Sequence, residues 1–267
     1  MRTPITSAKR IVVKVGTSTL AHENGQTHLA RMEKLSQVLS DLVNAGKEIV
    51  LVSSGAVGIG ASKMKLKQRP QTVLERQVAA AVGQSELMHL YSKFFGEYGH
   101  IVAQILLTRD VVEKRVLRTN VSNSFERLLS EGIIPVVNEN DPVATDEIEG
   151  EKSFGDNDTL SALVSELVKA DCLIILSDID GLYDKNPKTH HDAQLIHDVH
   201  TIDTTIHAMA GSSHSSLGTG GMATKIKAAE IASHANVNMI IADGSHPEIL
   251  YEILEGKTIG TWFHCSV

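Results

Sequence analysis

The sequence has few aromatic residues and cysteines, no long apolar run and no excess of positive charge. Aromatic residues make up 4% of the 267 residues, and the formal net charge is −7. An acidic chain without a block of lysine and arginine is a poor ligand for nucleic acid or an anionic membrane surface. No apolar run approaches the roughly 18 residues of a membrane-spanning helix, and the amino terminus lacks the apolar stretch of a signal peptide. We therefore expect a cytoplasmic protein that binds neither nucleic acid nor membrane.

The two cysteines and thirteen histidines do not predict a disulfide framework or a metal centre. Cys172 and Cys265 lie far apart and match no metal-ligand spacing. Cys172 belongs to the apolar run 172–176, in which a free thiol is typically buried. No H-E-x-x-H motif occurs among the histidines. We assign no residue of the chain as a metal ligand.

Short β-branched runs alternate with segments of helical period along the whole chain. Strands are expected at Ile11–Val15, Glu48–Val52, Ile101–Leu107, Ile133–Val137, Leu173–Leu176, Asn238–Ala242 and Thr258–Phe263. Most of these runs are continuously apolar, as in strands covered on both faces. Apolar stripes predict helices over Leu29–Ala45, around Leu160–Val168, from about Gly221 to His234, and across Val73–Tyr98. The alternation predicts α/β architecture, a three-layer α/β/α sandwich around a mainly parallel open sheet.

Ligands of open α/β sheets bind beyond the carboxyl ends of the strands, so the loops after the strands carry the chemistry. The first expected strand ends in Lys14-Val15-Gly16-Thr17-Ser18, which offers a cation, a glycine and two hydroxyls. The second leads into residues 53–60, whose small residues and glycines precede a helix and suit a carboxylate or a phosphate. For the first loop, the alternative is a lysine that only extends to solvent from the strand end. For the second, it is an ordinary tight turn.

Acidic and amide residues follow the fourth expected strand, at 138–142 and again at 154–159. Their oxygens could coordinate Mg²⁺, hold an ammonium group or orient lysines. Asp158 could instead be an ordinary helix N-cap before Thr159. The sequence leaves these alternatives open.

Two further loops suit a nucleotide. Ser177 and Asp178 follow the fifth expected strand, although a plain turn at Asp180-Gly181 is a competing interpretation. Residues 217–225 contain three glycines, two threonines and Lys225 at the start of a helix, an arrangement that can surround one anion with N–H groups and a cation. Neither a Walker A loop nor the protein-kinase motifs H-R-D and D-F-G occur.

Together these segments resemble the amino acid kinase family, over Ile11 to Phe263. Five motifs occur in the expected order: Lys-x-Gly-Thr-Ser, Ser-Ser-Gly-Ala, Asn-Glu-Asn-Asp, Gly-Asp-Asn-Asp and Gly-Thr-Gly-Gly-Met-x-Thr-Lys. The third and fourth favour the members that act on free L-glutamate. The resemblance implies transfer of a phosphoryl group from ATP to the γ-carboxylate of L-glutamate, with Mg²⁺ required, as the first step of proline biosynthesis.

The resemblance also implies a role for individual residues. Lys14 and Lys225 would contact the transferring phosphoryl group, and Asp158 would position the two lysines. Ser54, Asp141 and Asn157 would contact glutamate. The ATP-binding residues would be Lys14, Ser177, Asp178, Thr219, Gly220, Gly221, Met222, Ala223, Thr224 and Lys225.

The expected organisation is one kinase domain with two lobes. An N-terminal lobe, about residues 1–170, would bind glutamate, and a C-terminal lobe, about residues 171–267, would bind ATP. Many family members continue into a small domain similar to RNA-modification modules, and we expect this chain to lack it because it ends just after the last expected strand. The family further implies a homo-oligomer, and feedback inhibition by proline is left open.

Three alternatives compete with this interpretation. The chain could be a sibling kinase acting on N-acetylglutamate, aspartate, carbamate or UMP. It could be a catalytically silent sensor of a nucleotide or an amino acid, although such a sensor would need neither Lys14 nor Lys225. An RNA-binding role is disfavoured by the net charge of −7.

Overall fold

Eight strands form one sheet in the computed structural model, which describes residues 2–22, 24–144, 154, 156–211 and 221–265. The strand order is β3-β4-β2-β1-β5-β9-β10-β8. The strands are β1 (Arg10–Val15), β2 (Glu48–Ser53), β3 (Val102–Leu107), β4 (Ile134–Glu139), β5 (Cys172–Ser177), β8 (Asp198–Val199), β9 (Asn238–Asp243) and β10 (Thr261–Phe263). Neighbours are parallel except β10, which runs antiparallel to β9. The prediction of a mainly parallel open sheet is confirmed.

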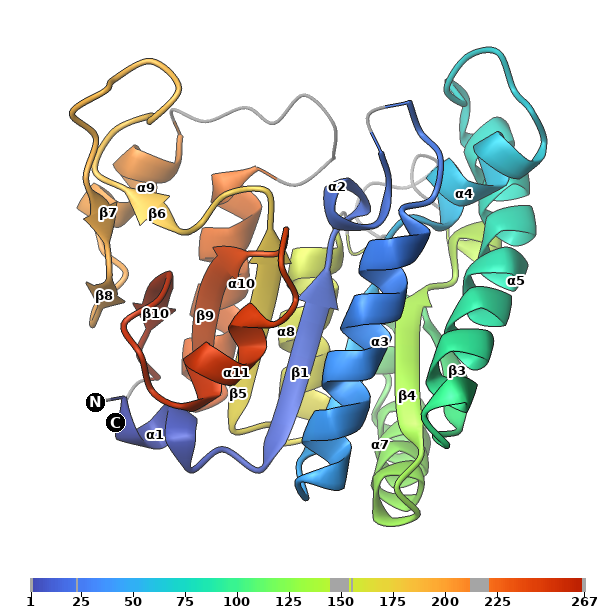
Figure 1. Ribbon diagram of the computed structural model, residues 1–267, viewed down its shortest axis with the longest axis horizontal. Helices are drawn as coiled ribbons and strands as arrows, with labels where there is room; N and C mark the ends of the chain where they lie inside the picture. Colours follow the sequence, from blue (N-terminus) through green and yellow to red (C-terminus); the bar gives the residue numbers. More distant parts are fainter. Residues whose placement is uncertain (1, 23, 145–153, 155, 212–220, 266–267) are drawn as a thin grey trace.

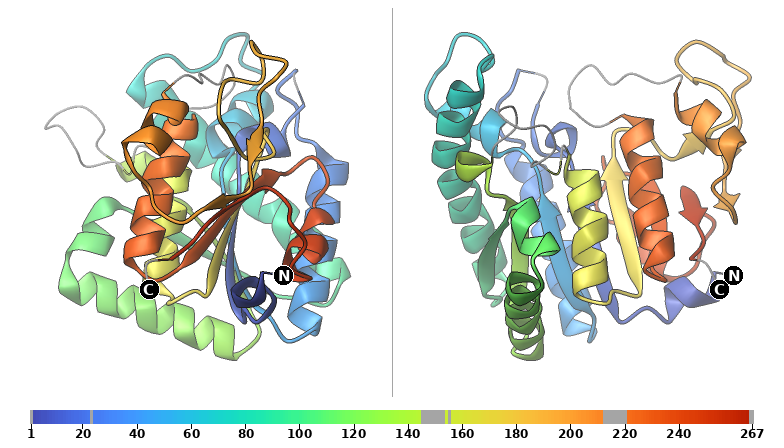
Figure 2. Two further views of the ribbon diagram at one scale, coloured as in Figure 1. Left: turned by 90° about the vertical axis from the view of Figure 1, so that its left-hand side faces the viewer. Right: turned by 180° about the vertical axis from the view of Figure 1, so that it is seen from behind.

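Helices cover both faces of the sheet (Figures 1 and 2). The layer in front of the sheet in Figure 1 contains α1 (Thr3–Thr6), α3 (Leu29–Asn44), α5 (Val73–Glu97) and α11 (Ile249–Leu254), and the layer behind it contains α7 (Arg115–Ser130), α8 (Asn157–Leu167) and α10 (Met222–His234). Shorter helices lie in the connections: α2 (Thr17–Leu20), α4 (Ala56–Lys63), α6 (Arg109–Glu113), α9 (Thr204–Ala210) and the 3₁₀ turn η1 (Asp141–Val143). The three-layer α/β/α sandwich is therefore confirmed.

The alternation of side chains along β1 divides the core into two clusters. Ile11, Val13 and Val15 pack in the cluster that includes α3 and α5, whereas Val12 packs in the cluster that includes α8 and α10. Successive side chains of a strand point to opposite faces. Lys14 consequently faces the α8–α10 layer, although its neighbours along the strand are buried and apolar.

The last expected strand is shorter in the structure than the sequence suggested. We expected Thr258–Phe263, and β10 covers only Thr261–Phe263. Gly260 has a φ of +63°, and a Cβ there would come 2.0 Å from the carbonyl oxygen of Ile241. Residues before Thr261 therefore turn away instead of extending the strand. The short strands β6 (Leu182–Tyr183) and β7 (Leu195–Ile196) pair with each other outside the main sheet and were not expected.

Two glycines bring α4 and α5 into backbone contact. A Cβ at Gly60 would lie 1.8 Å from the carbonyl oxygen of Ala79, and one at Gly83 would lie 1.8 Å from that of Ala56. No other residue has a side chain small enough for this approach. The contact fixes the position of the α4 amino terminus, which follows directly from the end of β2.

Within the described residues, no helix is both long and apolar enough to cross a membrane. Cys172 is buried on β5 and Cys265 is half-buried, and both thiols are free. The prediction that Cys172 is a buried thiol is confirmed.

Candidate active site

Those predicted functional residues that the structure describes lie at or just beyond the carboxyl ends of β1, β2, β4 and β5 and at the starts of α8 and α10, the upper edge of the sheet in Figure 1. Strands β1 and β2 are in register, with Val15 opposite Ser53, and β5 lies on the other side of β1. The helices α4, α8 and α10 all begin near this edge, so their first N–H groups lie at it. Helix amino termini attract anions through these unpaired N–H groups.

One carboxylate binds both predicted catalytic lysines. Oδ1 of Asp158 lies 2.6 Å from Nζ of Lys14, and Oδ2 lies 3.1 Å from Nζ of Lys225. The Thr224 hydroxyl is 2.9 Å from the same Oδ2. Asp158 is 1% exposed, Lys14 7% and Lys225 5%. Three charged side chains from β1, α8 and α10 thus form one buried cluster, which we call the Lys14–Asp158–Lys225 triad.

The triad carries a net positive charge. Burial raises the pKa of Asp158, but the ammonium groups of Lys14 and Lys225 outweigh this effect and bring it down to about 2. Asp158 is therefore ionised at neutral pH and compensates one of the two lysine charges. The other charge is available to an anion, and it acts in a desolvated setting, where electrostatic interactions are stronger than in water.

Asp158 is not the N-cap of α8, so that alternative is wrong. The N-cap is Asp156, whose Oδ1 accepts a hydrogen bond from the Thr159 N–H at 2.7 Å. Because Asp156 satisfies the helix end, Asp158 lies inside the first turn and its carboxylate is used by the lysines. The sequence did not point to Asp156 as the cap, and only the spatial position of Lys14 and Lys225 shows the role of Asp158.

A second group of predicted residues forms a network of amides and a hydroxyl. Asn157 Nδ2 donates to Ser54 Oγ at 2.9 Å and to Asn138 Oδ1 at 2.9 Å. Asn138 Nδ2 in turn donates to Gln84 Oε1 at 2.9 Å. The structure therefore joins two predicted substrate residues, Ser54 and Asn157, by a direct hydrogen bond, and it connects Asn157 to β4 and α5 through Asn138 and Gln84.

Sequence reasoning missed Gln84. The sequence feature that could have indicated it is a polar residue within an apolar helical stripe. Ala80, Leu87 and Tyr91 are buried on α5 at helical spacing on either side of Gln84. A buried glutamine among apolar neighbours generally has a hydrogen-bonding role. The sequence alone could not show that its partner is Asn138.

Glycines keep the backbone of two loops open at this edge. Gly55, the N-cap of α4, has a φ of +101°, a conformation that other residues rarely adopt. A Cβ at Gly16 would lie 3.6 Å from Nζ of Lys14, so the glycine leaves space beside the ammonium group. The role of these two loops in binding an anion stays a prediction.

Other predicted residues lie at the ends of β4 and β5. Asp141 begins η1 and is half-buried. Ser177 is buried at the end of β5 and donates to Oδ1 of Asp178 at 3.1 Å, and Asp178 itself is exposed. Ser177 is the last residue of β5, the strand next to β1, and Asp178 follows it.

The glycine-rich loop is described only from Gly221 onward, and Thr219 and Gly220 lie outside the described residues. Gly221 is the N-cap of α10. Met222 is 6% exposed and packs in the core, so any contact with a ligand would come from its backbone. Ala223 is exposed at the same helix start.

The described part of the chain contains no group of three or more histidine, cysteine, aspartate or glutamate side chains that could hold a metal ion. The Asp158 carboxylate is bound to two lysines. A magnesium ion at this site would therefore have to be held mainly by a nucleotide's phosphates and water, as is common for Mg²⁺.

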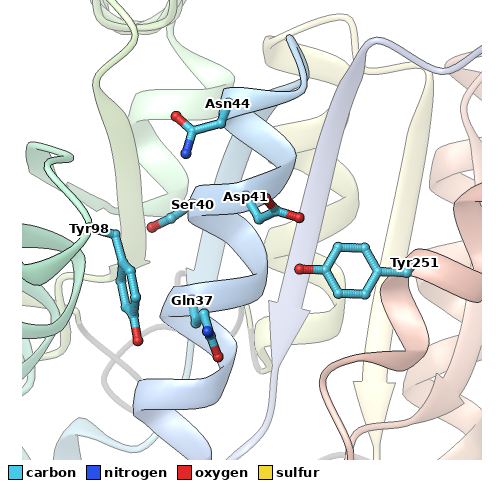
Figure 3. Close-up of a pocket in the computed structure, with 6 residues that line it drawn as sticks. All are labelled: Gln37, Ser40, Asp41, Asn44, Tyr98 and Tyr251. Carbon is cyan, nitrogen blue, oxygen red and sulfur yellow. The ribbon is translucent and has the colours of Figure 1, made fainter.

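A separate pocket of about 390 Å³ lies away from this edge (Figure 3). It is lined by Gln37, Ser40, Asp41, Asn44, Tyr98 and Tyr251. The α3 residues among them belong to its carboxyl-terminal half, which leads back to the start of β2 at the opposite edge of the sheet. Burial and the neighbouring Asp41 carboxylate raise the pKa of Tyr251 to about 12. None of the predicted site residues lines this pocket.

Comparisons with known proteins agree with the family named by the motifs. The model of the amino acid kinase family matches residues 9–243. A protein of Clostridium perfringens named glutamate 5-kinase is 56% identical over 263 residues, which cover 98% of this chain and 98% of the relative. A glutamate 5-kinase of Listeria monocytogenes is 54% identical over 98% of this chain and 95% of the relative.

A solved structure of carbamate kinase from Giardia lamblia bound to AMP-PNP is similar in fold. Its TM-score is 0.68 at 15% sequence identity, and the alignment covers 98% of this chain and 100% of that one. This similarity supports the architecture and not a particular substrate.

Proposed function

This chain belongs to the amino acid kinase family, and we propose that it transfers the γ-phosphoryl group of ATP to the γ-carboxylate of L-glutamate. The products are ADP and L-glutamyl 5-phosphate, and the reaction is the first step of proline biosynthesis. The observation that carries the reaction type is the buried Lys14–Asp158–Lys225 triad at the carboxyl edge of the sheet. The names of relatives more than 50% identical along the whole chain favour glutamate as the acceptor.

The chemistry fits a site that contains cations and no evident general base. Free glutamate has a side-chain pKa of about 4.3 and is ionised at neutral pH, so the attacking carboxylate needs no deprotonation. The reaction must instead bring two anions together and stabilise charge on the equatorial oxygens of the phosphoryl group. In our proposal, Lys14 and Lys225 contact that group, and Asp158 holds the two ammonium groups in place.

We assign glutamate to the network around Ser54. Asp141 would pair with the α-ammonium group, the turn at Ser54 and Gly55 would bind the α-carboxylate, and Asn157 would contact the same amino acid. The left-handed conformation of Gly55 and the bond between Asn157 and Ser54 support this assignment.

We assign ATP to the loops after β5 and before α10. Its contacts would be Lys14, Ser177, Asp178 and residues 219–225, with Lys14 and Lys225 reaching the phosphates. The chain would thus act as one domain in which residues from about 1 to 170 bind glutamate and residues from about 171 to 267 bind ATP. Mg²⁺ would accompany the nucleotide and neutralise phosphate charge, and no protein side chain is assigned to it.

We further propose a cytoplasmic homo-oligomer. The exposed side chains Leu74, Val78 and Val82 recur every four residues on α5 and form an apolar stripe that a second copy could cover. Proline is a candidate feedback inhibitor, and binding of nucleic acid or membrane is not part of the proposal. Sedimentation of the wild type beside a Leu74→Glu/Val78→Glu variant checks the oligomer, because only the variant should be monomeric.

The activity is tested by incubating the protein with ATP, Mg²⁺, L-glutamate and hydroxylamine, which traps an acyl phosphate as the hydroxamate. Parallel reactions contain aspartate, N-acetylglutamate or UMP in place of glutamate. We expect γ-glutamyl hydroxamate and ADP with L-glutamate alone. If the protein turns over only another acceptor, that acceptor replaces glutamate in the proposal. If it binds ATP but releases no ADP with any acceptor, the results favour a catalytically silent sensor.

A further inference from the structure

Gln84 on α5 lies behind the acceptor site, and no role follows for it from the reaction itself. It is 7% exposed, and the only hydrogen bond of its side chain within the described residues is the one that Oε1 accepts from Asn138 Nδ2. Its Nε2 is buried and has no hydrogen-bond partner there. A buried amide with one free donor is costly in free energy. The bond to Asn138 is therefore the interaction that explains a glutamine at this position.

The orientation of the Asn138 amide is fixed from two sides. Its Oδ1 accepts a hydrogen bond from the backbone N–H of Glu139 at 2.9 Å, a donor that cannot reverse. Its Nδ2 then points to Gln84, which must present an oxygen. Gln84 is the one acceptor that the described residues offer to this buried amine. Without Gln84, the Asn138 side chain would keep its hydrogen bond from the Glu139 N–H but lose the one that its Nδ2 donates.

The orientation of Asn138 is passed on to Asn157. Because Asn138 Oδ1 and Ser54 Oγ both accept from Asn157 Nδ2, the two hydrogens of that amine are used within the protein. The remaining polar atom of the side chain is Oδ1, which points away from Nδ2 by the geometry of an amide. Asn157 therefore offers a ligand an acceptor and no donor.

We propose that Gln84 is a positioning residue that sets the polarity of the acceptor site through Asn138, so that Asn157 Oδ1 accepts a hydrogen bond from the α-ammonium group of the substrate. This inference rests on the proposed function and deepens it. It makes the chain Gln84–Asn138–Asn157 a determinant of selectivity for an amino acid over the same dicarboxylate without its ammonium group. Gln84 does not touch the reacting atoms.

The test compares L-glutamate with glutarate, which lacks the α-ammonium group. We define selectivity as the ratio of the inhibition constant of glutarate to the KM of L-glutamate. Both constants are measured from the rate of γ-glutamyl hydroxamate formation. Gln84→Met and Gln84→Leu both remove the acceptor oxygen and keep a side chain of similar volume to glutamine. The test needs only one of these two variants to fold. We expect the ratio to fall about three- to tenfold, the effect of one hydrogen bond, while the KM for ATP stays within about twofold of the wild type.

Two further variants separate positioning from packing. Gln84→Glu keeps an acceptor oxygen for Asn138 and should retain the wild-type selectivity. Tyr91→Phe removes another buried hydrogen bond between α5 and the end of β2, the one to Ser53 Oγ at 2.8 Å, without touching the amide chain. We expect Tyr91→Phe to leave the ratio unchanged.

The outcomes distinguish the inference from the function beneath it. A wild type that forms no γ-glutamyl hydroxamate would refute the proposed function. If the wild type forms γ-glutamyl hydroxamate and the apolar Gln84 variants keep the wild-type selectivity ratio, the inference is refuted and the proposed function stands. An equal fall of the ratio in Tyr91→Phe would show that Gln84 acts only by packing α5.

Discussion

Lys14 and Lys225 bind different oxygens of one carboxylate, although one is on the first strand and the other on α10 near the end of the chain. Asp158 therefore does two things at once: it compensates buried charge and fixes the separation of two ammonium groups. A site for a transferring phosphoryl group needs that separation to be constant, because misplacement of a charged group weakens stabilisation of the transition state.

Removal of the Lys225 ammonium group should impair catalysis much more than folding. We expect Lys225→Ala to lower kcat by roughly 10²–10³, by analogy with the loss of one preorganised donor. Asp158 would keep Lys14 as its partner, so the variant should fold. Steady-state kinetics together with circular dichroism measure both effects, and a near-wild-type kcat in the folded variant would remove Lys225 from the mechanism.

The Asp158 carboxylate should make stability depend on pH in acid. Its pKa is about 2 in the folded protein and roughly 3.9 in an unfolded chain. A depressed folded pKa gives stability of about 2–3 kcal/mol, which is present at neutral pH and is lost progressively as the pH falls from about 5 through 2.

Asp158→Asn tests that dependence. Between pH 2 and 4 the free energy of unfolding of the variant should rise less steeply than that of the wild type, by up to about 1.4 kcal/mol per pH unit. It should also be about 3–5 kcal/mol less stable at pH 7, because two buried ammonium groups lose their partner. Urea denaturation at several pH values measures both quantities, and parallel pH profiles would show that Asp158 is not the titrating group.

Asp141 should affect one substrate more than the other. Asp141→Asn removes the negative charge assigned to the α-ammonium group of glutamate, so we expect the KM for glutamate to rise much more than the KM for ATP. The two KM values are measured at saturating concentration of the other substrate. Equal increases would indicate that Asp141 supports the structure of η1 and does not bind the ammonium group.

The backbone contact between α4 and α5 predicts different effects for two glycines of one helix. Gly83→Ala places a Cβ 1.8 Å from the carbonyl oxygen of Ala56, so we expect a loss of about 1–3 kcal/mol in stability and weaker binding of glutamate as α4 shifts. Gly96→Ala is the matched control, because nothing lies within 4 Å of its Cβ. It should be neutral or gain up to roughly 1 kcal/mol from reduced backbone entropy.

Thermal denaturation and the KM for glutamate distinguish these two variants. If both glycine variants lost the same stability, the helix position and not the close contact would be responsible.

The sequence by itself determined the main strands and helices and the place of Lys14 near the end of the first strand. Continuous apolar runs predicted strands covered on both sides, and the alternation of strands and helices predicted a parallel sheet. Those are local patterns, and the structure has a strand at each of the seven expected places, although β10 is shortened to Thr261–Phe263 and runs antiparallel to β9. The ordered motifs also identified the family, because five of them occur along the chain in the order that the family shows.

Only the tertiary structure decided which polar side chains meet. The sequence left open whether Asp158 caps α8 or binds the lysines, and the structure gives the cap to Asp156 and the lysines to Asp158. Gln84 was overlooked because its partner, Asn138, comes from a distant strand. Hydrogen bonds and ion pairs act over about 3 Å. Which residues come that close depends on how the layers pack, and local patterns of sequence do not contain that information.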